Sequence, residues 1–190
     1  MNKYIFATSN QHKFKEVSQQ LPNIELINLT DIGFHDPIVE DGSTLEANAL
    51  IKASIIYKKY NIACISDDTG LEVDALQGQP GVLSARYAGT PSNAQKNIAK
   101  LLHNLKGLCN RRAKFRTVIC LKNKVDQIFF EGVVNGVIAF HAMGNMGFGY
   151  DSIFIPDGYK KTFSEISLEE KNKISHRSKA IQKMAHYLCV

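Results

Sequence analysis

The sequence predicts an α/β domain with a mixed β-sheet and helices on both faces of that sheet. Two observations support this fold class. Short strand patterns alternate with helical patterns in the first half of the chain, and a pair of longer strand patterns joined by a tight turn follows in the second half. Alternation favours parallel strands with crossover helices, whereas a hairpin is antiparallel, so the sheet is expected to contain both kinds of pairing.

The N-terminal elements are a strand, a helix and a second strand. Residues 3–8 are β-branched and aromatic, which favours a short strand. Ser9 or Asn10 is placed to cap a helix that runs to about Leu21, and residues 24–28 fit the next strand.

A long amphipathic helix is predicted after a capping box in which Ser43 is the N-cap and Glu46 is the third helical residue. A short apolar strand, residues 62–66, follows and ends at Asp67. The helix is indicated by apolar residues at helical spacing, namely Leu45, Ala49, Ala53, Ile56, Tyr57 and Tyr60.

The second half is predicted to hold a hairpin between helices. Strands at about 113–122 and 126–139 are joined across Asn123-Lys124. The other elements expected here are a helix behind a capping box at Ser92-Asn93-Ala94-Gln95, a glycine-rich loop at 144–151, a short helix capped by Ser167, and a last helix at about 176–188.

Length and composition indicate a single globular domain, residues 1–190, which we expect in the cytoplasm. The chain is 44% hydrophobic and 22% charged, which argues against disorder or a coiled coil. Its apolar runs fall short of the roughly 18 residues of a membrane span, and the N-terminal run is too short for a secretory signal. The four cysteines and six histidines lack zinc-site spacing. A net charge of +5 favours anionic partners, but a lysine-rich solvated surface explains it equally well.

The first candidate binding cluster spans residues 8–13, Thr8-Ser9-Asn10-Gln11-His12-Lys13, between a strand and a helix. Hydroxyls, an amide and helix N-terminal N–H groups suit phosphate oxygens, and Lys13 adds a positive charge. The alternative is ordinary helix capping with a solvated lysine. The chain has no GxxxxGK[ST] or GxGxxG motif, so neither a P-loop nor a dinucleotide-binding turn is predicted.

A second group of candidates consists mainly of carboxylates, near the start of the long helix and at the end of the strand that follows it. Glu40 precedes the helix, Lys52 lies inside it, and Asp67 and Asp68 are adjacent. Neighbouring carboxylates are costly to bury unless a cation neutralises them, and oxygen ligands suit Mg²⁺. The alternative is that Asp67 and Asp68 only form a turn.

The third group suits a nucleobase. Phe148 and Tyr150 lie in the glycine-rich loop, and His176 and Arg177 begin the last helix. Aromatic rings stack on bases, and the two basic side chains are able to donate hydrogen bonds to a keto oxygen. The alternatives are core packing of the rings and a helix start that is basic without a ligand.

The order and spacing of these clusters closely resemble the inosine triphosphate pyrophosphatase family, which hydrolyses non-canonical purine nucleoside triphosphates. The resemblance covers about residues 3–186. It implies Mg²⁺-dependent hydrolysis of ITP, dITP and XTP to the monophosphate and pyrophosphate, and an elongated sheet with two lobes around a central active-site cleft, usually as a homodimer. The strings that carry it are Ala7-Thr8-Ser9-Asn10, Glu40-Asp41-Gly42, Asn48-Ala49, Lys52-Ala53, Ser66-Asp67-Asp68-Thr69-Gly70-Leu71, Pro80-Gly81-Val82, Ser84-Ala85-Arg86-Tyr87, Gly147-Phe148-Gly149-Tyr150-Asp151, Glu170-Lys171 and Ile174-Ser175-His176-Arg177.

The resemblance also implies roles for single residues. Glu40 and Asp68 would hold the metal, Asp68 would also be the general base, and Lys52 would act near the phosphates. The triphosphate would contact Thr8, Ser9, Asn10, Gln11, His12 and Lys13, and the rest of the substrate would contact Thr69, Phe148, Gly149, Tyr150, Asp151, Lys171, His176 and Arg177. With the purine substrates that the resemblance implies, we expect Arg177 to donate to the C6 keto oxygen of the base.

The chain departs from the family pattern in two places. Ala47 stands before Asn48 where the family often has Glu. In the glycine-rich loop, Met146 stands where the family often has Gly, and Ser152 follows Asp151 where it often has Pro. Two rival functions remain open: a related pyrophosphatase acting on pyrimidine or modified triphosphates, and a nucleotide- or RNA-binding module with a basic face. We expect no membrane partner, because the apolar runs are too short, and no nucleic-acid partner, because the Asp67-Asp68 pair would repel phosphates unless a metal intervened.

Overall fold

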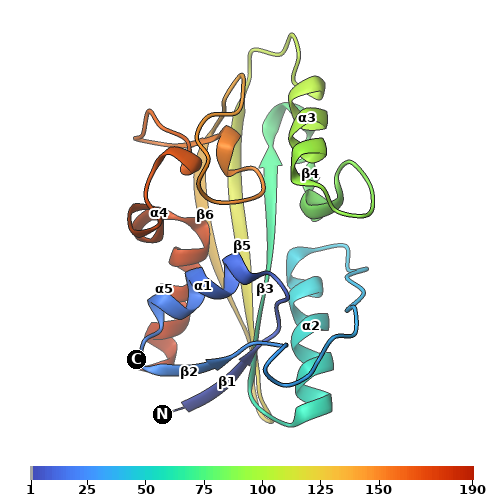
Figure 1. Cartoon of the computed structure of the whole chain (residues 1–190), viewed down its shortest axis with the longest axis vertical. Coiled ribbons are helices and arrows are strands. Elements are labelled where there is room, and N and C mark those ends of the chain that lie inside the picture. The colour runs from blue at the N-terminus through green and yellow to red at the C-terminus, as the bar shows by residue number, and fades with distance from the viewer. Residues whose placement is uncertain (1) are drawn as a thin grey trace. The chain divides into compact units, whose positions relative to one another are not determined.

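The computed structural model describes residues 2–190, and it has a mixed sheet with helices, as the sequence predicted. The hydrogen-bonded order of its strands is β2-β1-β3-β5-β6-β7, and β4 pairs with β3. Strands β1 to β6 are labelled in Figure 1. The chain forms two compact units. The first comprises residues 1–68, 117–132 and 177–190, and the second comprises residues 69–116 and 133–176.

The first unit is built on parallel strands. β1 (Asn2–Phe6) pairs in parallel with β2 (Ile24–Ile27) and with the start of β3 (Cys64–Val73). Parallel neighbours need crossover connections, and α1 (Gln11–Gln20) and α2 (Leu45–Tyr60) provide them.

Side-chain alternation along these strands gives the first unit two separate cores. Phe6 and Ile65 pack with the helix residues Val17 and Ile181. Ile5 and Cys64, the neighbouring strand residues, pack instead with α2 in a second cluster that also contains Ala49, Ala53 and Ile56. Helices therefore cover both faces of this part of the sheet, because α1 and α5 (His176–Leu188) share one core and α2 the other.

The second unit is built mainly on antiparallel pairs. The end of β3 pairs with β4 (Pro80–Gly81), and β6 (Gln127–Ile138) pairs with β7 (Phe154–Pro156). The core joins Leu71, Leu101, Phe115, Phe154 and Phe163. The unit also contains α3 (Ala94–Asn104), α4 (Leu168–Ile174) and the first part of β5 (Arg112–Lys122), whose second part belongs to the first unit.

The predicted hairpin is confirmed, and one predicted strand end is wrong. Between β5 and β6, Asn123 Oδ1 accepts hydrogen bonds from the backbone N–H groups of Val125 and Asp126, which closes the turn. The strand expected to end at Asp67 continues to Val73. Asp67 and Asp68 therefore lie inside a strand, and the turn that we considered as their alternative role does not form there.

Two helices are capped one residue later than expected. Thr44, not Ser43, is the N-cap of α2 and accepts a hydrogen bond from Ala47 N at 3.1 Å. Asn93, not Ser92, caps α3 through Lys96 N at 2.9 Å. Thr and Asn cap helices about as well as Ser, so the sequence alone did not distinguish adjacent candidates. The cap at Ser167 is confirmed.

Across residues 2–190, we find no helix with the length and apolar character of a bilayer span.

Candidate active site

The first part of the candidate site lies where β1 gives way to α1. Asn10 caps the helix and accepts hydrogen bonds from the backbone N–H groups of His12 and Lys13. Thr8 Oγ1 accepts from Asn10 N at 3.2 Å, which orders the turn. Ser9, Gln11 and His12 are exposed there. The Lys13 side chain is 16% exposed, and its Nζ lies 3.1 Å from the Asp67 carboxylate.

Asp67 and Asp68 contact different helices because neighbouring residues of a strand point to opposite faces. Asp67 contacts Lys13 of α1 and accepts a hydrogen bond from Arg177 Nε of α5 at 3.2 Å. Asp68 contacts α2, where Asn48 Nδ2 donates to its Oδ2 at 3.1 Å and Lys52 Nζ lies 3.8 Å from its Oδ1. The two carboxylates therefore belong to two separate polar clusters.

The cluster around Asp67 is buried and closely paired. Arg177 and Asp67 are each 1% exposed, and Arg177 also forms an ion pair through Nη1 with the buried carboxylate of Glu16. Burial alone would raise the pKa of Asp67, but Lys13 and Arg177 outweigh it and hold that pKa well below its usual range. Burial would lower the pKa of Arg177, and Glu16 and Asp67 reverse this so that the pKa is raised. Asp67 therefore stays ionised at neutral pH.

The cluster around Asp68 has a more open carboxylate pair. Lys52 forms an ion pair with Glu40, whose side chain is 32% exposed, and it lies near Asp68, whose side chain is 12% exposed. Burial raises the pKa of Asp68; Lys52 and Lys13 oppose this, and Glu40 adds to it. Asn48 fixes the approach to the cluster because its Oδ1 accepts from Gly42 N at 2.8 Å. A Cβ atom at Gly42 would lie 2.7 Å from Asn48 Oδ1, so this close approach requires glycine.

These two clusters place cations and carboxylates together in the first unit. Glu40 and Asp68 are the residues that could hold a hard metal ion, and Lys13 and Lys52 could contact phosphate oxygens. Within residues 2–190, no group of three or more His, Cys, Asp or Glu side chains is placed to hold a metal. An ion at this site would therefore use two carboxylates and take its other ligands from water or substrate.

In the second unit, the glycine-rich loop is held by Asp151. Its Oδ2 accepts from Phe148 N at 2.9 Å and from Lys171 Nζ at 2.7 Å. Lys171 Nζ also lies 4.9 Å from the centre of the Phe148 ring. Gly147 has a φ of 75°, and a Cβ atom there would lie 2.3 Å from Asp151 Oδ2. The loop therefore presents Phe148 in a fixed position, and Phe148 and Gly149 are half-buried rather than enclosed.

Two other expected substrate residues of this unit are buried. The Tyr150 hydroxyl donates to the Ser84 carbonyl at 2.9 Å, and burial raises the pKa of that hydroxyl. The His176 ring stacks on Phe115 with centroids 4.5 Å apart. The first contact agrees with the core-packing alternative for Tyr150, whereas the alternative considered for His176 was a basic helix start, and its packing against Phe115 was not expected. Thr69 is half-buried in β3.

Arg177 contacts groups other than those expected from the sequence. We expected it to reach the C6 oxygen of a purine together with His176, but its guanidinium is enclosed between Glu16 and Asp67. The physical reason is that an isolated buried carboxylate is costly, and this cation offsets two of them.

Two polar residues of the first unit had no predicted role, although Asn48 stands in one of the motifs. Glu16 follows Lys13 by three residues on α1, and Asn48 precedes Lys52 by four on α2, so each lies on the same helix face as a predicted site residue. Polar residues on a face that is otherwise buried are the signal that could have identified them.

Comparison with known proteins places this arrangement in a family. The model of the Ham1 family matches residues 4–187. The chain is 48% identical to the dITP/XTP pyrophosphatase of Flavobacterium psychrophilum over 96% of this chain and 97% of that protein. It is 47% identical to the protein of the same name from Porphyromonas gingivalis, over 99% of this chain and 98% of that one.

Solved structures agree with the sequence relatives. The Ham1 protein of Staphylococcus aureus is 38% identical with a TM-score of 0.89, covering 98% of each chain. A HAM1 protein from Coxiella burnetii is 35% identical with a TM-score of 0.91, covering 100% of this chain and 99% of that one. The family expected from the order of the motifs is thus confirmed: the chain belongs to the Ham1 family.

Proposed function

We propose that the protein hydrolyses non-canonical purine nucleoside triphosphates, namely dITP, XTP and ITP, to the monophosphate and pyrophosphate. The observation that carries the proposal is the match over nearly the whole chain to proteins named dITP/XTP pyrophosphatase. The geometry of the first unit supports it, because lysines and carboxylates from α1, β3 and α2 together suit a polyphosphate bound with a cation.

The residues around Lys52 fit Mg²⁺, which we propose as the cofactor. Glu40 and Asp68 both face the Lys52 ammonium, so the two carboxylates already share one positive charge in this structure. Proteins commonly bind Mg²⁺ through one or two carboxylates together with substrate phosphates and water, and two carboxylates are what this cluster offers. A bound Mg²⁺ would supply neutralisation of charge on the phosphate oxygens.

The residues of the first unit would then have different roles at the phosphates. Lys13 and Lys52 would offset the negative charge that develops on the pyrophosphate leaving group. Asp68 would orient the attacking water and accept its proton, because Asp67 is already held by Lys13 and Arg177. The capped turn from Thr8 to His12 would contact the triphosphate through hydroxyl, amide and backbone N–H groups.

The second unit would bind the nucleoside. We propose that Phe148 stacks on the base, with Lys171 held beside it by Asp151. Gly149 and Tyr150 would shape the loop, and Thr69 and His176 would complete the substrate contacts. A donor facing the C6 position favours the keto oxygen of hypoxanthine and xanthine over the amino group of adenine.

We further propose that residues 1–190 act as one catalytic domain in the cytoplasm, as a homodimer without nucleic-acid or membrane partners. These expectations rest on the family resemblance and on composition. Light scattering coupled to size-exclusion chromatography tests the dimer, and a monomer mass at micromolar protein would refute it.

The decisive experiment is product analysis with ITP and dITP in Mg²⁺. We expect pyrophosphate and monophosphate to appear together, without inorganic phosphate and without a diphosphate intermediate. EDTA should abolish turnover if the metal is required. Stepwise release of phosphate would refute α–β cleavage, and saturable binding without turnover, weakening steeply with salt, would favour the binding-module alternative.

Substrate comparison tests the other alternative. Rates with dITP and XTP should exceed those with dTTP and UTP if the enzyme selects purines that carry a C6 keto group. Equal or higher rates with the pyrimidine triphosphates would assign the protein to a different pyrophosphatase activity.

A further inference from the structure

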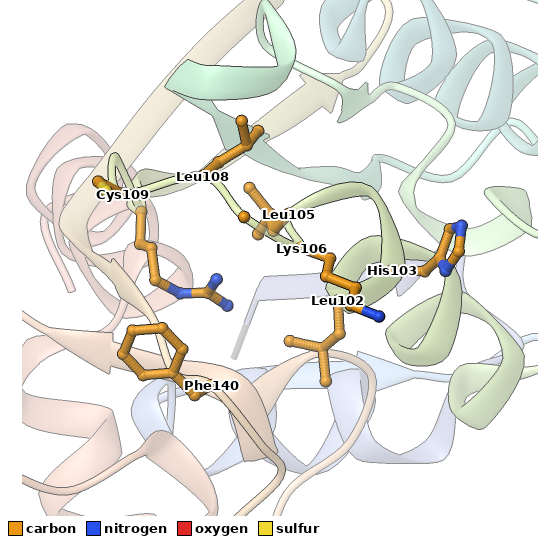
Figure 2. Close-up of a pocket in the computed structure, with 9 residues that line it drawn as sticks. Leu102, His103, Leu105, Lys106, Leu108, Cys109 and Phe140 are labelled. Atoms are coloured by element: carbon orange, nitrogen blue, oxygen red, sulfur yellow. The ribbon is translucent and has the colours of Figure 1, made fainter.

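The second unit contains a hollow that the proposed function does not use. It has a volume of about 570 Å³ and is lined by residues from the end of α3, from the segment that leads to β5, and by Phe140 (Figure 2). Its described lining residues lie outside the candidate active site. The volume is within the roughly 300–1,000 Å³ range of small-molecule sites.

The most informative lining residue is Arg111, a buried cation. Only 9% of it is exposed, and its Nε and Nη2 donate to the carbonyls of Ile138 and Ala139 at 2.6 and 2.7 Å. A guanidinium has five N–H donors, so these two bonds leave others to satisfy. Among the described residues, no carboxylate forms an ion pair with Arg111, and burial lowers its pKa.

The neighbouring residue Arg112, unlike Arg111, is paired with a carboxylate. Arg112 is half-exposed and forms a two-pronged contact with Asp157, at 2.8 and 3.0 Å. Burying a charge is costly unless an opposite charge or hydrogen bonds compensate for it, and it is the buried Arg111, not the exposed Arg112, that lacks a carboxylate. The fold therefore holds a preorganised positive charge at this hollow.

The rest of the lining is largely apolar, apart from His103 and Lys106. Phe140 is 79% exposed although its ring lies 4.5 Å from the Arg111 guanidinium carbon. Leu102, Leu105 and Leu108 also line the hollow (Figure 2). The lining residues of the described chain include Lys106 and no Asp or Glu. A neutral or cationic ligand would leave Arg111 uncompensated, whereas an anion would pair with it.

We infer that this hollow is a second binding site, for a small organic anion with a carboxylate or phosphate group on an aromatic or apolar body. The anionic group pairs with the free donors of Arg111, since guanidinium matches both kinds of oxyanion. The body packs between the exposed face of Phe140 and the leucines. The chemistry shared by the two anion classes, an oxyanion beside an apolar group, is what the site recognises.

Cys109 provides a local readout, because it lines the hollow and is exposed. A global binding assay would also detect phosphate binding at the proposed active site. We therefore propose to measure iodoacetamide alkylation of Cys109 by peptide mass spectrometry, with the exposed Cys189 as the internal reference. Phenyl phosphate and benzoate test the two anion classes, benzyl alcohol is the neutral probe, and inorganic phosphate lacks the apolar body.

The expected result is saturable protection of Cys109 by phenyl phosphate, benzoate or both, with Cys189 unaffected and benzyl alcohol much weaker. Arg111→Gln should raise the half-protecting concentration by about tenfold or more, because it removes hydrogen bonds to a charged group. Arg112→Gln, the matched control, should change it less than about twofold. Phe140→Ala removes an exposed ring, so this variant is expected to fold. It should weaken the protection of Cys109 by phenyl phosphate but not the protection by inorganic phosphate.

Several outcomes would overturn the inference. The first is that no anion protects Cys109 saturably, and the second is that the Arg111 and Arg112 variants weaken protection equally. The others are that benzyl alcohol alone protects Cys109, or that Phe140→Ala leaves protection by phenyl phosphate unchanged. If Arg111→Gln does not fold, the Phe140 variant and the probe series still decide the matter. Protein self-association that is lost in Phe140→Ala would instead assign the hollow to a contact with a second copy of the chain.

Discussion

Two adjacent carboxylates in β3 have different environments because a strand directs neighbouring side chains to opposite faces. Asp67 is held by cations of α1 and α5, and its pKa is lowered after Lys13 and Arg177 outweigh the effect of burial. Asp68 faces α2 and Glu40, and burial raises its pKa. The buried residue therefore fixes the position of Lys13, and the more open one is suited to act on substrate.

Asp68→Asn should nearly abolish ITP hydrolysis while leaving the fold intact. Loss of a general base that also holds the metal should lower kcat by about 10³-fold or more. Steady-state kinetics with circular dichroism as the folding check measures this. Asp67→Asn is the matched variant, and it should destabilise the fold because Lys13 and Arg177 lose a shared counter-charge. Turnover of the Asp68 variant within about tenfold of the parent would reassign the base, with Asp67 as the first candidate.

Arg177→Ala should be strongly destabilising, because it leaves the carboxylates of Glu16 and Asp67 buried without this cation. Removing one partner of a buried ion pair costs about 3–5 kcal/mol, and urea unfolding measures it. Arg112→Ala, which removes an exposed pair with Asp157, is the control and should change stability little. The hypothesis from the sequence, that Arg177 contacts the C6 oxygen, predicts a different result. In that case the fold would keep its stability, and ITP would lose more kcat/KM than ATP.

Helix α2 shows how one element combines packing with chemistry. Ala49, Ala53 and Ile56 bury its apolar face, and Asn48 and Lys52 lie among them. Because Asn48 and Lys52 are one turn apart, they point in the same direction, and both contact Asp68. The packing of α2 therefore sets the position of the side chains that would contact metal and phosphate.

Thr44→Ala should destabilise the protein by about 1 kcal/mol, since the Thr44 hydroxyl satisfies the Ala47 N–H at the start of α2. Ser43→Ala is the matched control, because Ser43 is the adjacent hydroxyl residue and does not cap the helix. Urea unfolding followed by circular dichroism compares the two. A larger loss in the Ser43 variant would place the N-cap at the residue expected from the sequence.

At the scale of elements, regular patterns were predictable and short elements were not. The spacing of apolar residues located α2 and α5, and the turn at Asn123 located the hairpin. β4 and β7 have two and three residues, too few to form a pattern, and long-range pairing alone defines them. The extension of β3 through Asp67 and Asp68 was missed because charged residues disfavour strands unless tertiary partners compensate for them.

The family was predictable from the order of the motifs, whereas the pairing of the site residues was not. The order of the motifs located most candidate residues, because each motif is local in sequence. Glu16 and Arg177 are 161 positions apart, so their ion pair depends on α1 and α5 sharing one core. No local pattern carries that information, and Arg177 was accordingly assigned to a ligand rather than to a buried carboxylate.

The four cysteines allow the integrity of the whole molecule to be followed. Cys64 and Cys120 are buried in one core, whereas Cys109 and Cys189 are exposed. Burial raises the pKa of Cys120 from 9.0 to about 11, so very little reactive thiolate forms in the folded protein at pH 8. The folded state favours the neutral thiol, and this contribution to stability is complete below pH 9.0 and lost as the pH rises toward about 11.

We therefore expect two thiols to react rapidly with Ellman's reagent at pH 8, and Cys64 and Cys120 to react only when the protein unfolds. The unfolded state that exposes these two thiols is rare and refolds quickly, so the slow rate at which they react is proportional to the equilibrium population of that state. The Thr44→Ala variant, about 1 kcal/mol less stable, should then expose the two buried thiols about fivefold faster, and Ser43→Ala should match the parent. Because Cys64 shares its core with Ala49, Ala53 and Ile56 of α2, loosening that helix acts directly on the measured thiol. Slow-phase rates that are equal in all three proteins would mean that the thiols are reached by a local opening that does not involve the start of α2.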